Sequence, residues 1–181
     1  MADSALNKVD SFSIDPTSGN LTFISATATD GGAGVVVDPS GRFVYVAGLG
    51  IDAYTISNTG VLTPISEVYA DVGEPNAVVV DPSGRFLYAA NNTTNDVSAF
   101  AIDYNTGSLT PLRGSPFPAG SGPRSMTLDA SGSFAYVANA GDNDLSAYTI
   151  DPTSGALIAN SAAPFAAGNN VYWVTTTGNI H

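Results

Sequence analysis

The 181-residue chain contains no cysteine, and its single histidine, His181, is the last residue. The absence of cysteine excludes disulfide bridges, thiolate catalysis and cysteine-ligated zinc. One terminal histidine argues against a Ser-His-Asp triad and against a histidine-rich metal site, because both need an imidazole held inside the fold. We therefore expect no metal and no other cofactor, and any acid–base chemistry would have to use carboxylates.

Positive charge is also scarce, since five Lys and Arg residues stand against 16 Asp and Glu residues, for a formal net charge of −11. Nucleic acids and anionic membranes bind clustered basic faces, so we expect neither as a partner. Residues 1–8 lack the basic start and apolar core of a signal peptide. The uncharged stretch 152–181 is broken by Gly, Pro, Asn and Ser, which argues against a membrane span.

What the chain has in abundance is internal repetition. The stretch VVVDPSGRFVYVAG at 35–48 recurs as VVVDPSGRFLYAAN at 78–91, and more loosely as MTLDASGSFAYVAN at 126–139. Asp-Pro-Ser-Gly suits a type I turn, and the apolar runs on both sides predict a β-hairpin. The unbroken run of valines predicts a first strand that is buried on both faces. We expect the phenylalanines of these repeats to occupy equivalent packed positions: Phe43, Phe86 and Phe134.

A second hairpin pattern follows each copy of the first. It consists of an alternating strand with one aromatic residue, a turn that ends in glycine, and a strand that begins near a leucine. The aromatic residues Phe12, Tyr54, Phe100 and Tyr148 lie 42, 46 and 48 residues apart. Four strands in a unit of this length are typical of a β-propeller blade. The sequence therefore predicts an all-β propeller of four-stranded antiparallel blades.

The segments DPSGRFVYVAG, DPSGRFLYAANN and ASGSFAYVANAGDNDLSAYTIDPTSGAL resemble the YVTN-type repeats of the seven-bladed propeller proteins that are grouped with lactonases. The resemblance extends over nearly the whole chain. It implies a propeller fold, and the family name implies hydrolysis of a lactone.

We predict a single propeller domain over residues 1–181 that contains about 3.75 blades. Residues 1–33 would supply the third and fourth strands of a broken blade, with Met1 inside its second strand. Whole blades would follow at 34–73, 74–121 and 122–168, and the first strand of the next blade at 169–181. Three assemblies fit this division: part of a larger ring, a ring completed by a second copy in a homodimer, and a closed four-bladed monomer.

Propeller ligands bind at one end of the central channel, on loops between blades and between the second and third strands. Asn76, Arg124 and Tyr172 share one aligned position there, and the residue type differs from blade to blade, as expected of a binding site built on a repeat scaffold. The candidate ligand-binding residues in these loops are Glu74, Asn76, Asn91, Arg124, Ser125, Asn139, Asp142, Tyr172 and Trp173. The main hypothesis is a module that binds a small molecule or a protein. The alternative is a lactone hydrolase that uses Arg124 and loop carboxylates.

Overall fold

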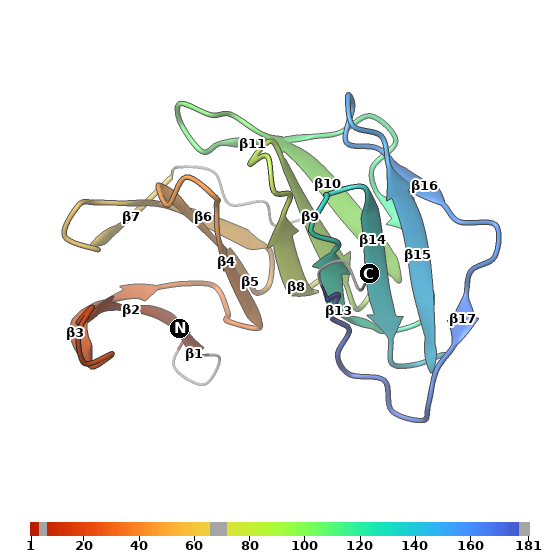
Figure 1. Ribbon diagram of the computed structural model, residues 1–181, viewed down its shortest axis with the longest axis horizontal. Coiled ribbons are helices and arrows are strands. Elements are labelled where there is room, and N and C mark those ends of the chain that lie inside the picture. Colours follow the sequence, from red (N-terminus) through yellow and green to blue (C-terminus); the bar gives the residue numbers. More distant parts are fainter. Residues whose placement is uncertain (4–6, 66–71, 178–181) are drawn as a thin grey trace.

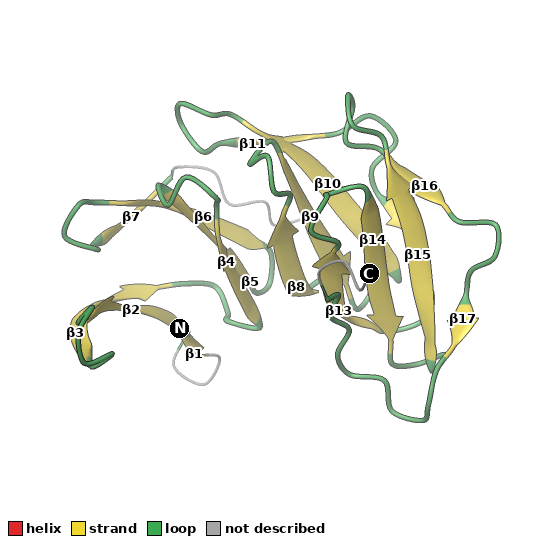
Figure 2. Ribbon diagram, viewed as in Figure 1, coloured by secondary structure: helices red, strands yellow, loops and turns green. Residues whose placement is uncertain are grey.

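Seventeen β-strands and no helix make up the part of the chain that the computed structural model describes, residues 1–3, 7–65 and 72–177 (Figure 2). Within these ranges no helix is therefore long and apolar enough to cross a membrane. The strands form separate antiparallel sheets that follow one another along an arc (Figure 1). This arrangement confirms the predicted fold class, a propeller of four-stranded blades.

The sheets follow the chain in order. The N-terminal sheet contains β1 (Ala2–Asp3), β2 (Lys8–Ile14) and β3 (Leu21–Ala28). Blade 1 contains β4 (Gly34–Val37), β5 (Phe43–Ala47), β6 (Ile51–Ile56) and β7 (Leu62–Pro64). Blade 2 contains β8 (Pro75–Val80), β9 (Phe86–Asn91), β10 (Asp96–Ile102), β11 (Leu109–Pro111) and β12 (Phe117–Pro118). Blade 3 contains β13 (Pro123–Leu128), β14 (Phe134–Asn139), β15 (Asp144–Ile150), β16 (Leu157–Ala159) and β17 (Phe165–Ala166).

The arc is open. Figure 1 shows the N-terminal sheet and blade 3 at its two ends, with the first strands β4, β8 and β13 toward the inside. The closed four-bladed monomer is therefore wrong for this chain, because its first and last sheets do not meet to close a ring. The equivalent first-strand positions of successive blades lie side by side along the inner wall of the arc.

The repeated turns have the chemistry that the sequence predicts. The Asp38 carboxylate accepts hydrogen bonds from the backbone N–H groups of Ser40, Arg42 and Phe43, at 3.0, 2.9 and 2.8 Å. Asp81 and Asp129 repeat this pattern in blades 2 and 3. Each turn is closed by a glycine with positive φ. Local side-chain bonds thus set the same hairpin three times.

The expectation that the three repeat phenylalanines are equally packed is wrong for Phe134. Phe43 and Phe86 are 4% and 6% exposed, whereas Phe134 is 42% exposed. The first two rings are covered by turns of the following blade, at Gly107 and Gly155. Phe134 belongs to the last blade of the arc, and within the described residues no following turn covers it.

The expectation that the first strand is buried on both faces is wrong for blade 1. Val35 and Val37 are 40% and 52% exposed, while Val78, at the position of Val35 in blade 2, is 6% exposed. The reason is the preceding sheet. In the described residues the N-terminal sheet places no first strand beside β4, and an apolar groove of about 410 Å³ lies between that sheet and blade 1.

The two ends of the described chain differ in how far they follow the repeat. Ala2 pairs with Val9, in the register by which Ala138 pairs with Leu145 in blade 3, so β1 is the end of a second strand, as the alignment of Met1 predicts. The first strand expected over 169–181 does not form in the described part, residues 169–177. Residues 178–181 lie outside the described ranges. Segment 171–177 instead lies beside β13 without strand pairing.

The repeated aspartates predict a loss of stability in acid. Burial opposes ionisation of Asp38, but hydrogen bonds from the Ser40 hydroxyl and from the backbone of Phe43, Ser40 and Arg42 outweigh it and lower the Asp38 pKa. A carboxyl with a lowered folded-state pKa stabilises the fold above its unfolded pKa of about 3.9 and loses this contribution as pH falls through the folded value. Between about pH 5 and pH 2, we expect the free energy of unfolding of Asp38→Asn to fall less than that of the parent. Urea unfolding at each pH measures both. Parallel curves would contradict this expectation.

Candidate functional site

Four equivalent positions of the repeat, at or just before the start of a first strand or in the segment that takes its place, come together at one end of the inner wall. Ala33, Asn76, Arg124 and Tyr172 stand one after another along the arc, and with Trp173 they line a hollow of about 300 Å³. Radial packing of blades explains this convergence, because residues at one repeat position lie at one level of the channel. The predicted site residues Asn76, Arg124 and Tyr172 therefore meet, and Trp173, also predicted, lies beside them.

The hollow combines a cation with two aromatic rings. The Arg124 guanidinium carbon lies 4.8 Å from the centre of the Tyr172 ring, within the range of a cation–π contact. Trp173 is 82% exposed, so its indole is available to a ligand. A guanidinium offers planar hydrogen-bond donors to a carbonyl, carboxylate or phosphate, and the rings offer flat apolar surface.

A second hollow of about 380 Å³ shares Ala33 and Asn76 with the first and is also lined by Glu74, Asp30 and Asn7. Asn76 therefore lies between the cation and the carboxylates, and its Nδ2 donates to the Pro123 carbonyl oxygen at 3.2 Å. The sequence prediction missed Ala33, Asp30 and Asn7. Alignment of the repeats would have found Ala33, but Asp30 and Asn7 carry no signal that separates them from ordinary loop residues.

The backbone at Glu74 is strained in a way that its equivalents avoid. Glu74 has φ = 53°, and the same position holds Gly31, Gly122 and Asn170 in the other repeats, all with positive φ. Glycine and asparagine tolerate this region, whereas glutamate costs roughly 1 kcal/mol there. A carboxylate kept at a strained position beside a hollow suggests a function for the side chain.

We expect Glu74→Gly to raise the free energy of unfolding by about 0.5–1 kcal/mol, because glycine adopts φ = 53° without strain. The matched control is Gly122→Ala at the equivalent position, φ = 65°, which should lower stability by about 1 kcal/mol or more. Urea unfolding of both variants measures whether each substitution raises or lowers the free energy of unfolding. A loss of stability in Glu74→Gly would show that the carboxylate supports the fold.

Two predicted site residues, Asn91 and Asn139, do not belong to the site. They are 1% and 0% exposed, at the ends of β9 and β14 inside their blades. The Asn139 Nδ2 donates to Asp144 Oδ1 at 2.7 Å and to Ser146 Oγ at 2.8 Å, and Asn91 makes the same pair of bonds in blade 2. Their amides tie the second strand to the third, and neither residue lines either hollow.

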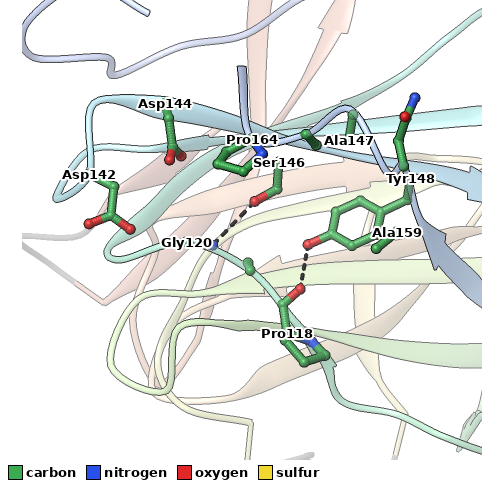
Figure 3. Close-up of a pocket in the computed structure, with 12 residues that line it drawn as sticks. Pro118, Gly120, Asp142, Asp144, Ser146, Ala147, Tyr148, Ala159 and Pro164 are labelled. Carbon is green, nitrogen blue, oxygen red and sulfur yellow. Dashed lines mark hydrogen bonds between the residues drawn. The ribbon is translucent and has the colours of Figure 1, made fainter. Parts of the chain in front are cut away.

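Asp142 and Ser125 also make internal contacts. The Asp142 carboxylate accepts from the Ser121 backbone N–H at 2.7 Å, and the buried Ser125 hydroxyl accepts from the Val174 N–H at 3.2 Å. Asp142 lines a different pocket, of about 250 Å³, in which Ser146 accepts from the Gly120 backbone and Tyr148 donates to Pro118 (Figure 3). Across the described ranges, no three His, Cys, Asp or Glu side chains are grouped to hold a metal.

The fold and the repeated turns define a β-propeller built from one repeated blade. The family model "Lactonase, 7-bladed beta-propeller" matches residues 2–122 and 77–175. The chain therefore belongs to the lactonase family of seven-bladed β-propellers. No curated protein matches it significantly.

Solved structures show the same fold. A putative 6-phosphogluconolactonase from Bacteroides fragilis has a TM-score of 0.79 at 21% identity, covering 95% of this chain and 52% of its own. A putative 6-phosphogluconolactonase from Bacteroides uniformis has a TM-score of 0.78 at 19% identity, and the match covers 91% of this chain and 50% of that protein. The periplasmic gluconolactonase PpgL of Pseudomonas aeruginosa has a TM-score of 0.75 at 21% identity, and the match covers 93% of this chain and 51% of that protein. The chain thus spans about half the length of these proteins.

Proposed function

We propose that this chain forms about half of a lactone-hydrolysing propeller, and that the hollow between Asn76, Arg124 and Tyr172 binds the lactone. The observation that carries the proposal is the convergence of equivalent positions on one hollow that holds a cation against an aromatic ring. Membership of the lactonase family supports hydrolysis over the binding module that we took as the main hypothesis. The neighbours described as gluconolactonases point to a sugar lactone as the substrate class.

The chemistry assigns a role to each side chain. Tyr172 and Trp173 contact the face of the sugar ring. The Arg124 guanidinium donates to the lactone carbonyl oxygen and stabilises the negative charge that develops there. The Glu74 carboxylate takes a proton from water as the water oxygen attacks the carbonyl carbon. The acyl–oxygen bond then breaks as the protonated Glu74 carboxyl returns its proton to the ring oxygen, which gives the open hydroxy acid and restores the carboxylate.

We expect Arg124→Gln to lower kcat/KM for a sugar δ-lactone by about 10²-fold or more, because it removes the charge that stabilises the oxyanion. Glu74→Gln should lower kcat with little change in KM, since it removes the base and keeps the shape. Arg113→Gln is the matched control, because Arg113 is exposed beyond β11 and away from the hollow. A pH-stat assay with plain and phosphorylated lactones measures all three. The proposal fails if the parent chain hydrolyses neither, or if Arg113→Gln and Arg124→Gln behave alike.

A further inference from the structure

The backbone that carries the site residues into the hollow is held by an asparagine of the blade before. Asn95 is the last residue of the loop between β9 and β10, and Asn143 is the last residue of the loop between β14 and β15. The Asn95 Oδ1 accepts a hydrogen bond from the Gly122 N–H at 2.8 Å. The Asn143 Oδ1 accepts one from the Asn170 N–H at 2.7 Å. Both donors stand two residues before a residue that lines the hollow.

Each asparagine binds the connection between two blades at two points. The Asn95 carbonyl oxygen also accepts from the Ala119 N–H at 3.0 Å, and the Asn143 carbonyl oxygen accepts from the Ala167 N–H at 3.0 Å. The two N–H groups that one asparagine binds lie three residues apart along the connection. The same two-point contact occurs in both places, so it belongs to the repeat and is not an accident of one loop.

The backbone conformation of the two asparagines points to a role for their side chains. The φ angle is 59° at Asn95 and 57° at Asn143. Glycine adopts this region without strain, whereas asparagine only tolerates it. Most of the described residues with positive φ are glycines. We therefore attribute the asparagines to what glycine lacks, the Oδ1 atom that binds the next connection.

The residues before Arg124 are bound on several sides. The Gly122 carbonyl oxygen accepts from a backbone N–H of its own blade at 2.9 Å, and its N–H donates to Asn95 of blade 2. Pro123 is buried, and its carbonyl oxygen accepts from the Asn76 Nδ2 at 3.2 Å. The Arg124 side chain is exposed, so the place of its guanidinium depends on this backbone.

Tyr172 is held by the backbone on both sides of it. Asn170, two residues before, is bound by Asn143, and the Val174 N–H, two residues after, donates to the Ser125 Oγ at 3.2 Å. The Tyr172 ring is 48% exposed. Its packing alone therefore does not fix it, and the two bonds of the flanking backbone carry much of its placement.

We propose that Asn95 and Asn143 are positioning residues of the site. Asn95 sets the place of the Arg124 guanidinium, and Asn143 sets the place of the Tyr172 and Trp173 rings. The inference rests on the proposed function, in which the cation stabilises developing charge and the rings bind the sugar. A displaced cation weakens an interaction of the transition state, which lowers kcat. Displaced rings weaken the binding of substrate and transition state alike, which raises KM.

Kinetics of matched variants test this division of roles. Asn95→Gly and Asn143→Gly each remove one Oδ1 and suit the existing φ, so each is the control for the other. With D-glucono-δ-lactone in a pH-stat, we expect Asn95→Gly to lower kcat about fivefold or more and to leave KM within about twofold. Asn143→Gly should raise KM about fivefold or more and leave kcat within about twofold. Asn95→Asp and Asn143→Asp keep an acceptor and tolerate positive φ, so both should stay within about twofold of the parent.

Amide hydrogen exchange, measured by NMR, tests the same contacts without a lactone. Asn95→Gly should raise the exchange rate of the Gly122 N–H about threefold or more and leave that of the Asn170 N–H unchanged. Asn143→Gly should do the reverse.

The outcomes separate this inference from the proposed function. A parent that hydrolyses no lactone defeats the proposed function, and the exchange pattern then decides alone whether the asparagines hold the two connections. Unchanged exchange at both amides would overturn the inference. In an active parent, the same change of kcat and KM in both glycine variants would overturn it too, because a purely structural bond predicts no split. Aspartate variants as impaired as the glycine variants would also contradict it.

Discussion

Phe86→Ala is expected to lower the free energy of unfolding by about 3–5 kcal/mol, one of the largest losses available to a single substitution in this chain. The ring is 6% exposed and lies under the turn at Gly155, whose Cβ position is 2.5 Å from it. The Arg85 guanidinium carbon lies 4.9 Å from the ring centre. Truncation leaves a cavity between two blades that the rigid turn cannot fill, and it removes the cation–π contact.

Phe134→Ala is the matched control, because it deletes the same ring at the same repeat position without a covering turn. We expect Phe134→Ala to lower the free energy of unfolding by less than about 1.5 kcal/mol. Urea unfolding monitored by circular dichroism measures both variants. Equal losses at the two positions would mean that the ring is stabilised by its own blade, and that the following blade contributes little.

Asn139→Asp is expected to destabilise the fold by about 3–5 kcal/mol at pH 7. Asn139 is 0% exposed, and its Nδ2 lies 2.7 Å from the Asp144 carboxylate. The substitution replaces a donor by a second carboxylate at that distance. A fully buried carboxylate cannot stay ionised this close to the half-buried Asp144 carboxylate, so the pair must hold a proton and its folded-state pKa is raised.

The raised folded-state pKa of this carboxyl pair fixes the sign of the pH dependence of the free energy of unfolding. Relative to the parent, Asn139→Asp should be least destabilised below the unfolded pKa of about 3.9, and the deficit should grow as pH rises through the folded value. Asn160→Asp is the control, because Asn160 is exposed and uses only its Oδ1, which accepts from the Ala162 N–H at 2.9 Å. That variant should stay within about 0.5 kcal/mol of the parent at all pH values. A deficit for Asn139→Asp that is constant with pH would contradict the argument.

The candidate site was predicted in part from sequence. Alignment of the repeats placed Asn76, Arg124 and Tyr172 at one position, and radial packing brings them to one hollow. Asn91 and Asn139 were assigned to the site because they stand in the loops expected between the second and third strands. Their amides point back into the blade, toward an aspartate and a serine on the third strand. The direction of a side chain at a strand end depends on the pairing register, which the residue type does not specify.

The sequence by itself determined the hairpins, their period and the blade, because these depend on local chemistry: an aspartate that binds the N–H groups of its own turn, a glycine with positive φ, and strand positions that alternate every two residues. Only the tertiary structure decided which copies of a repeated residue are buried. Phe86 and Phe134 have the same local sequence role, yet Phe86 is 6% exposed and Phe134 is 42% exposed. Val78 and Val35 also share a position, and they are 6% and 40% exposed. The difference arises because burial in a propeller comes from the neighbouring blade, and whether a neighbour is present is not encoded in the repeat itself.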